Sequence, residues 1–416
     1  IWLSVLQRRF LFLLLLVVGS LIGKGQESDG AYRPLAVYTE VLAKIKSDYV
    51  EEPNMEKVTN GALQGLVEFL DPQSSYLTAE QFEKVAEHLD YPDRGSGLST
   101  GLVVRKRSGY ATVLHVLPGS AGDRAGIRPF DLIEAIDGLS TQLMPPAYLR
   151  AMLSGPPESS VTVLVRSLRR SEEPQEHTLV RAPLEAPAVE HKMLEGDVGY
   201  LALTAADNES VERLAGAVKR LESQGAGKLV LDLRGNAVGE TEKGVRLADL
   251  FLDSGLITSL KGQQYPEKKF HAGPDSSITS LPLVVITDRA TAGAAELAAA
   301  AILDNKRGEV VGERTYGLAA VQETITMEDG AALILSVAKY RRPNGDALQD
   351  GGLTPSFPLP PATVRRYRMS RFPGADGMLS IPPEIPDEAE RGQEDPYLKK
   401  ALEVLTGDAA AKETAA

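Results

Sequence analysis

Apolar residues recur at helical spacing along residues 34–90 of the chain. The pattern predicts helices over 55–70 and 79–89, and Thr78 with Gln81 forms a capping-box motif at the start of the second of these. We therefore expect a helical N-terminal region over residues 34–90.

Short β-branched runs between glycine and serine clusters replace this pattern over residues 91–172. Runs of this kind are typical of strands. The expected strands are 102–104, 111–116, 132–136 and 161–165, and the expected short helices are 121–126 and 147–153. We therefore expect a compact β-rich module, which ends in a charged loop over 171–176.

Strand and helix patterns alternate over residues 185–360, as is typical of an α/β core. The expected strands are 199–205, 228–234, 283–286, 309–311 and 332–338, and the expected helices are 209–224, 243–252 and 290–303. Residues 361–416 are proline-rich and then acidic, which indicates a polar, partly disordered tail with one amphipathic helix over 396–405.

An apolar run near the start of the chain follows two positive charges. Arg8 and Arg9 precede nine consecutive apolar residues over 10–18, a pattern typical of an export signal or a membrane anchor. We interpret residues 1–23 in this way, and whether they are cleaved stays open. We expect the rest of the protein to lie outside the cytoplasm, in the periplasm or cell envelope. If residues 1–23 are an anchor, they attach its N-terminus to the membrane.

The composition narrows the possible chemistry. The 416 residues carry a formal net charge of −12, which disfavours a nucleic-acid partner. No cysteine is present, which excludes disulfides and thiolate nucleophiles. We expect no metal site and no cofactor, because no two histidines have metal-ligand spacing, and we interpret all five as surface or hydrogen-bonded side chains. They are His88, His115, His177, His191 and His271.

Two motifs within residues 91–172 resemble the PDZ domains of exported proteases. They read Ser120-Ala-Gly-Asp-Arg-Ala-Gly-Ile127 and Asp131-Leu-Ile-Glu-Ala-Ile-Asp-Gly138. PDZ domains bind a peptide C-terminus as an added strand and capture its carboxylate on backbone N–H groups. The resemblance implies that protein or peptide C-termini are partners. It places the carboxylate loop at Ser99, Thr100, Gly101 and Leu102.

The stretch 281–322 has the pattern of a strand, a tight turn, an alanine-rich helix, a second strand and a glycine-bearing loop. Many hydrolases present a nucleophile at such a strand–turn–helix joint, because the helix N-terminus supplies N–H donors for an oxyanion. This stretch contains no serine, cysteine or histidine, and its one lysine is Lys306. The joint therefore lacks the usual catalytic side chains.

Further motifs follow in one order along the chain. They are Leu70-Asp-Pro-Gln-Ser-Ser-Tyr-Leu77, Asp232-Leu-Arg-Gly-Asn236, Ala248-Asp-Leu-Phe251 and Val311-Gly-Glu-Arg-Thr-Tyr-Gly317. Together with the PDZ motifs, they resemble the carboxyl-terminal processing proteases, the tail-specific serine peptidases. The resemblance covers nearly the whole chain after residue 34. It implies an α+β multidomain protein with a helical N-terminal region, a PDZ-like β-rich module and an α/β peptidase core of the ClpP/crotonase type.

Active members of this family use a serine nucleophile, a lysine base and a glutamine that orients the lysine. Aligned through Glu296, the nucleophile position of this chain is Gly293. Aligned through Gln322, which is retained, the lysine position is Leu318. The separation of these positions fits the family spacing. Since a serine hydroxyl needs a base to take its proton, loss of both residues closes the covalent route.

The turn that resembles the family's oxyanion turn is also altered. It comprises Val238 and Gly239, and Ala237 and Val238 stand where the family has a proline and a glycine. A β-branched residue does not readily adopt the positive φ that glycine allows. The leading hypothesis is therefore an inactive relative that binds peptide or protein C-termini, or regulates another protein.

Two alternatives stay open. The first is an active serine-type endopeptidase with displaced residues, in which Thr291 replaces the nucleophile or Lys339 reaches the cleft. The second is a scaffold or regulator that assembles with an active paralogue. Asp232 and Glu313 are interpreted as structural carboxylates.

Overall fold

The computed structural model describes residues 29–89, 98–107, 109–167, 173–182, 189–237, 239–364, 367 and 394–407. Its contacts separate the chain into two units, Ile1–Leu63 and Gln64–Ala416. The first unit contains α2 (Asp29–Asp48) and the start of α3 (Met55–Glu68). Both are amphipathic helices, as the apolar spacing predicts.

The apolar segment expected to be an export signal or anchor, residues 1–23, lies outside the described residues. Among the helices that the structure does describe, none combines the length and the apolar content that a bilayer-spanning segment needs.

The β-rich module forms a six-stranded antiparallel sheet in the order β2-β3-β4-β6-β7, with β5 beside β4. Its strands are β2 (Leu102–Arg107), β3 (Tyr110–Val116), β4 (Leu132–Ile136), β5 (Leu139–Ser140), β6 (Ser160–Arg166) and β7 (Gln175–Val180). Its helices are η1 (Leu98–Thr100), α5 (Ala121–Arg124), η2 (Thr141–Leu143) and α6 (Pro146–Leu153). Buried and half-buried residues alternate along β6, so the β-branched run predicted from the sequence is a strand with one face in the core.

Helix α4 (Ala79–Leu89) starts at the capping box that the sequence predicts. The Thr78 N–H donates to Gln81 Oε1 over 3.1 Å, and the Gln81 N–H donates to Thr78 Oγ1 over 3.4 Å. This reciprocal pair satisfies two N–H groups that the first helical turn leaves without a partner. Val85 of this helix belongs to the same apolar cluster as Leu149 of α6, so α4 is part of the core of the β-rich module.

The α/β core is built on a second six-stranded sheet, in the order β17-β14-β13-β10-β9-β8. All pairs in it are parallel except the edge pair of β8 and β9. Its strands are β8 (Glu190–Leu194), β9 (Val198–Ala202), β10 (Lys228–Asp232), β13 (Leu283–Thr287), β14 (Glu309–Gly312) and β17 (Phe357–Pro358). Its crossover helices are α7 (Asn208–Ser223), α8 (Lys243–Asp249) and α9 (Gly293–Asp304).

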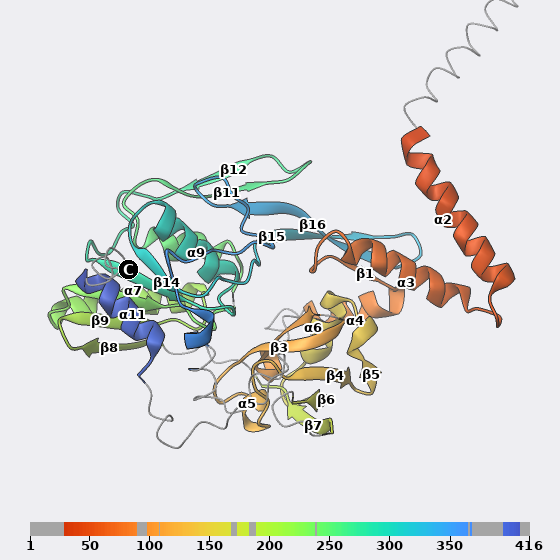
Figure 1. Ribbon diagram of the computed structural model, residues 1–416, viewed down its shortest axis with the longest axis horizontal. Helices are drawn as coiled ribbons and strands as arrows, with labels where there is room; N and C mark the ends of the chain where they lie inside the picture. Colours follow the sequence, from red (N-terminus) through yellow and green to blue (C-terminus); the bar gives the residue numbers. More distant parts are fainter. Residues whose placement is uncertain are drawn as a thin grey trace, which may run out of the picture. The chain divides into compact units, whose positions relative to one another are not determined.

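Helices cover both faces of this sheet. Leu229 and Leu231 of β10 share an apolar cluster with α7, α8 and α9. Val230 packs on the opposite face with Tyr397 of α11 (Pro396–Thr406), which lies against that face in Figure 1. Strands that are buried on both faces are apolar throughout, which explains why the run at 228–232 is recognisable in the sequence.

A third sheet has the order β1-β16-β11-β12, with β15 paired to β16. Its strands are β1 (Ser75–Leu77), β11 (Leu256–Lys261), β12 (Lys268–His271), β15 (Ala320–Thr326) and β16 (Ala332–Arg341). Ser75 of β1 pairs with Ile334 of β16, so the segment before α4 is hydrogen-bonded to the core.

The structure differs from the sequence-based expectation where strands are polar. The expected loop over 171–176 is wrong at its end, because Gln175 and Glu176 pair with Val165 and Leu164 as the start of β7. Strands β8, β12 and β15 were not predicted, since they expose many polar residues and depend on the backbone bonds of their neighbours. The helix expected over 396–405 is present as α11.

Candidate active site

Three turns, over 233–239, 288–292 and 313–319, follow the carboxyl ends of β10, β13 and β14. Ligand sites in open α/β sheets form at this edge. The Ala292 N–H donates to the Asn236 carbonyl over 2.9 Å, which joins the first two turns. The strand–turn–helix joint that the sequence predicts is therefore one corner of a three-turn site.

Asp288 organises the turn that precedes α9. Its Oδ1 accepts hydrogen bonds from the N–H groups of Gly235 and Ala290, each over 3.0 Å. The Thr291 hydroxyl lies 3.1 Å from the same oxygen and 2.9 Å from the Leu233 carbonyl. Because Thr291 is wholly buried, its hydroxyl is held inside the turn and is not among the groups that line the nearby cavity.

Gly293 is the first residue of α9 and has a φ of +59°. A Cβ at this position would lie 3.7 Å from Gly239 O, 3.7 Å from Thr241 Oγ1 and 3.9 Å from Leu318 O. These are ordinary contact distances, so a side chain fits there. The left-handed backbone conformation is unfavourable for a residue with a side chain, and glycine removes that strain.

The three atoms nearest to this Cβ position are oxygens, and two of them belong to carbonyl groups. Gly239 itself has a φ of +117°, and a Cβ there would lie 2.5 Å from Ala206 O, so this position requires glycine. Val238, the other residue of the expected oxyanion turn, lies outside the described residues.

The structure brings Leu318 next to Gly293, as the carbonyl distance shows. Glu296 of α9 holds the loop that carries Leu318. Its carboxylate accepts the N–H of Gly317 over 2.8 Å and the N–H of Leu318 over 3.0 Å, and it also accepts the Thr315 hydroxyl. The main chain therefore determines the position of residue 318, whatever its side chain.

Glu296 is wholly buried, and this burial raises its pKa to about 7, although the hydrogen bonds from Thr315 and from backbone N–H groups act in the opposite direction. In the sequence, Glu296 stands out as the residue through which the family motif aligns. Glu296 is an acidic residue within the otherwise apolar run of α9. This position is the sequence signal that its carboxyl group is buried and hydrogen-bonded.

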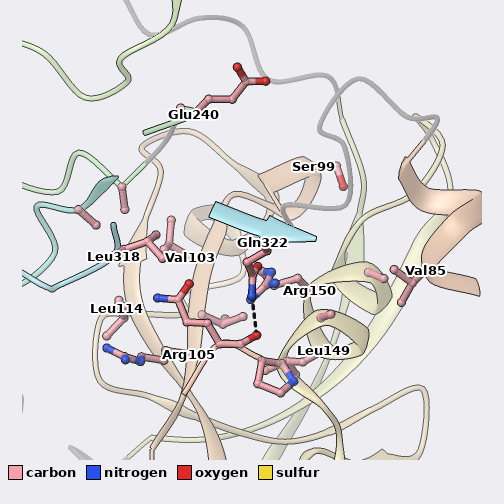
Figure 2. Close-up of a pocket in the computed structure, with 18 of the residues that line it drawn as sticks. Val85, Ser99, Val103, Arg105, Leu114, Leu149, Arg150, Glu240, Leu318 and Gln322 are labelled. Carbon is pink, nitrogen blue, oxygen red and sulfur yellow. Dashed lines mark hydrogen bonds between the residues drawn. The ribbon is translucent and has the colours of Figure 1, made fainter. Parts of the chain in front are cut away.

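Gln322 is the retained residue of the expected catalytic group. Its Nε2 donates to the Gln73 carbonyl over 3.0 Å, the bond drawn in Figure 2. With leucine at position 318, there is no lysine at that position for the amide to orient. The amide instead joins β15 to the segment that precedes β1.

A cavity of about 940 Å³ extends from these turns into the β-rich module (Figure 2). The module contributes residues from η1, β2, β3 and α6 to the lining, among them Ser99, Val103, Arg105, Leu114, Leu149 and Arg150. The core contributes residues from the three turns, the start of α7, the segment that leads into α8, and β15, among them Gly239, Glu240, Ala292, Leu318 and Gln322. One cavity therefore joins the β2–α6 groove to the Gly293–Leu318 corner.

The expected carboxylate loop is placed beside this groove. Ser99 lines the cavity, and its hydroxyl donates to the Leu153 carbonyl over 3.2 Å. Thr100 and Leu102 are wholly buried. Gly101 has a φ of +76°, and a Cβ there would lie 2.0 Å from Ser120 Cβ, so this position requires glycine.

The interpretation of all five histidines as surface or hydrogen-bonded residues is wrong for His115. Its Nε2 is buried without a hydrogen-bond partner among the described residues. A Cβ on Gly235, whose φ is +68°, would lie 2.5 Å from the His115 ring. Burial lowers the pKa of His115, and the nearby Asp288 carboxylate partly opposes this shift. The fold brings β3 against the 233–239 turn, which sequence spacing does not reveal.

The remaining candidate residues lie in structural contacts. Lys339 forms an ion pair with Asp350 over 3.1 Å and is not among the cavity-lining residues. Glu313 accepts the Tyr397 hydroxyl over 2.7 Å and pairs with Arg289 over 2.8 Å. Across the described ranges, no group of three or more metal-ligating side chains is placed to hold an ion.

Comparison with known proteins identifies the family. Residues 197–359 match peptidase family S41, and residues 112–167 match the PDZ domain. The carboxyl-terminal-processing protease of Synechocystis sp. is 30% identical over 317 residues, which cover 75% of this chain and 73% of that relative. This chain belongs to peptidase family S41.

Other S41 relatives match over a similar span. The carboxy-terminal-processing protease of Bartonella bacilliformis is 28% identical over 366 residues, 86% of this chain and 82% of the relative. The solved structure of a photosystem II D1 C-terminal processing protease superposes with a TM-score of 0.60 at 25% identity, over 78% of this chain and 93% of that one. The predicted fold class, with a helical region, a PDZ module and an α/β peptidase core, is confirmed.

Proposed function

We propose that this S41 chain is catalytically inactive and that it binds protein or peptide C-termini, acting as a binding or regulatory protein outside the cytoplasm. One observation carries this proposal. Motif register assigns Gly293 and Leu318 to the family's serine and lysine positions, and the structure brings the two residues together, with the Gly317 and Leu318 N–H groups held by Glu296.

The available side chains do not supply a substitute catalytic pair. Thr291 is held inside its turn by Asp288 and the Leu233 carbonyl. The Thr241 hydroxyl lies 3.7 Å from a Cβ built on Gly293, but it makes no hydrogen bond to a lysine or histidine among the described residues. A hydroxyl without a base is a poor nucleophile at neutral pH.

Peptide binding is supported by the cavity. PDZ domains receive a peptide as a strand between the elements that correspond here to β2 and α6. Val103 of β2 and Leu149 of α6 supply apolar walls to a cavity of about 940 Å³, which is large enough for several side chains. A peptide that enters the groove can therefore continue to the Gly293–Leu318 corner. The export part of the proposal depends on the apolar pattern of residues 1–23.

The test combines cleavage and binding on one preparation. The purified chain is incubated with an unfolded polypeptide that ends in apolar residues, and intact masses are followed over time while calorimetry measures binding. We expect saturable binding without new fragments. Time-dependent cleavage that Thr291→Ala or Thr241→Ala abolishes would establish a displaced nucleophile and overturn the proposal. Co-purification with an active paralogue instead of peptide binding would favour the scaffold alternative.

A further inference from the structure

Arg150 brings a guanidinium group into the cavity. It is the only charged residue of α6, whose sequence is otherwise Pro, Ala, Tyr, Leu and Met. It is half-buried and lines the cavity together with Leu149 and Gln322, as Figure 2 shows. The helix face that forms one wall of the PDZ groove therefore carries a fixed positive charge.

This guanidinium has no hydrogen bond and no ion pair among the residues that the structure describes. The neighbouring cations on β2 differ in this respect. Lys106 pairs with Glu68 over 3.1 Å, and the Arg105 guanidinium lies 4.0 Å from the centre of the Tyr316 ring. Arg150 is thus a cation of the groove with no compensating charge among the residues that the structure describes.

Arg150 is only partly exposed, and a cation that has lost part of its water costs free energy unless it has a partner. Burial lowers the pKa of Arg150, and no carboxylate offsets this effect. An arginine nevertheless stays protonated near neutral pH, so it serves as a fixed cation and not as a base. With no such partner in the described part of the chain, the site is suited to an anion that arrives with a ligand.

The acidic residues of the cavity lie on the core side of the groove. They belong to the start of α7 and to the turn before α8, and they are Asp207, Glu209 and Glu240. Glu240 is paired with Lys243 over 3.6 Å, and Glu209 is paired with Arg213. Arg150 on α6 therefore offers an anionic ligand a cation, whereas the opposite wall offers carboxylates.

We propose that Arg150 binds a carboxylate of the peptide that occupies this cavity, and this inference rests on the proposed peptide-binding function. A guanidinium donates two parallel hydrogen bonds to a carboxylate, which fixes the orientation of the bound group. The carboxylate is either the chain terminus of the peptide or an aspartate or glutamate side chain near it. Arg150 then decides which peptides the cavity accepts.

The experiment uses the full chain and three fluorescein-labelled peptides with an apolar sequence. The first ends in a free carboxyl group, the second is the same peptide amidated at its end, and the third is amidated and carries one glutamate near its end. Fluorescence anisotropy measures the dissociation constants for wild type, Arg150→Gln and Arg150→Lys. Arg124→Gln, an exposed arginine of the β-rich module outside the cavity lining, is the matched control.

We expect the wild type to bind the first and third peptides, which carry a carboxylate, more tightly than the second. Arg150→Gln should bind the first and third about ten- to hundredfold more weakly than the wild type does, with no change for the second. Arg150→Lys should show an intermediate loss of affinity, because a lysine keeps the charge but lacks the two parallel N–H donors of a guanidinium. Preference for the first peptide identifies the terminal carboxylate, and equal binding of the first and third identifies any carboxylate. Equal binding of all three peptides by wild type and Arg150→Gln overturns this inference but leaves the proposed function standing.

A second measurement does not depend on the peptide. An uncompensated cation kept for a ligand destabilises the free protein, so Arg150→Met should raise the midpoint of thermal unfolding of the unliganded chain. A lower midpoint would show that Arg150 has a structural partner, which contradicts the inference. If wild type binds none of the peptides, the proposed function fails, and the inference fails with it.

Discussion

The main-chain N–H of Leu318 donates a hydrogen bond of 3.0 Å to the carboxylate of Glu296. This bond explains how the loop keeps its shape with a leucine at position 318. The loop is held through backbone N–H groups and the Thr315 hydroxyl, and none of these contacts involves the side chain at position 318. A lysine can therefore be replaced by leucine there without releasing the loop.

Glu296 makes the stability of the chain depend on pH. Its pKa rises from 4.5 to about 7 on folding, so the folded state holds the proton more tightly than the unfolded state. The stability that the folded protein gains from this protonated carboxyl group is fully present below about pH 4.5. It is lost as the pH rises through about 7. Urea denaturation gives the unfolding free energies of the wild type and of Glu296→Gln. We expect the wild-type value minus the variant value to fall by up to about 3 kcal/mol across this pH range.

The glutamine variant is the reference in this experiment because it keeps the shape of the side chain but does not titrate. A difference in unfolding free energy that stays constant with pH, or one that grows as the pH rises, would contradict the raised pKa of Glu296.

Gly244 sets how closely α8 approaches α9. A Cβ at this position would lie 2.3 Å from the Ala294 carbonyl oxygen, next to Gly293. Gly244→Ala should therefore shift the start of α9 and lower the free energy of unfolding by about 1–3 kcal/mol. Chemical denaturation measures this change.

Gly216→Ala is the matched control for this substitution. Gly216 lies within α7, where a Cβ would meet only the flexible end of Arg220 at 3.4 Å. Alanine there should stabilise the helix by about 0.5–1 kcal/mol. Equal destabilisation by both variants would argue against the close approach of α8 and α9.

Asp395 anchors α11 to the core sheet. Its carboxylate accepts the N–H groups of Tyr397 over 3.0 Å and Leu398 over 3.4 Å, and it pairs with Arg234 over 2.8 Å. Asp395→Ala removes the helix cap and this ion pair, so α11 should lose about 1–2 kcal/mol of local stability. Amide hydrogen exchange of residues 396–406 measures this loss.

Glu394→Ala serves as the control, since the one ion pair of Glu394 with a described residue is that with the exposed Lys399. Exposed ion pairs contribute less than about 1 kcal/mol, so its effect on exchange should be small. Faster exchange in the Glu394 variant than in the Asp395 variant would mean that the cap does not hold the helix.

Restoring the two lost residues should restore weak peptidase activity. A Cβ fits at Gly293, although the positive φ will cost the serine about 1–3 kcal/mol of strain. We expect Gly293→Ser with Leu318→Lys to cleave an unfolded substrate slowly, and each single variant to remain inactive, because nucleophile and base act together. Activity in the Gly293→Ser variant alone would show that another base is present.

The sequence alone predicts the elements whose apolar residues follow a regular spacing. The strand over 228–232 and the amphipathic helix α7 were recognisable because their apolar spacing reports the faces they bury. The positions Gly293 and Leu318 followed from motif register, since Glu296, Gly312, Thr315 and Gln322 serve as alignment points beside them. Local pattern and tertiary structure agree at these places.

Contacts between segments distant in sequence could not be predicted. The lone charge of α6 was visible in the sequence, but the lack of a partner for Arg150 depends on which groups the fold brings near it. The contact of His115 with Gly235, and that of Gln322 with Gln73, arise in the same way. Polar strands such as β15 depend on pairing with β16, which a period-two pattern does not reveal.

The central claim is that no activated nucleophile is present at the Gly293–Leu318 corner. Intact-protein mass spectrometry after incubation with a serine-reactive fluorophosphonate tests it most directly. The account predicts an unchanged mass for the wild-type chain and a single added group for the Gly293→Ser, Leu318→Lys variant. A stoichiometric adduct on the wild-type chain, mapped to Thr241, Thr291 or a hydroxyl that lines the cavity, would contradict the account.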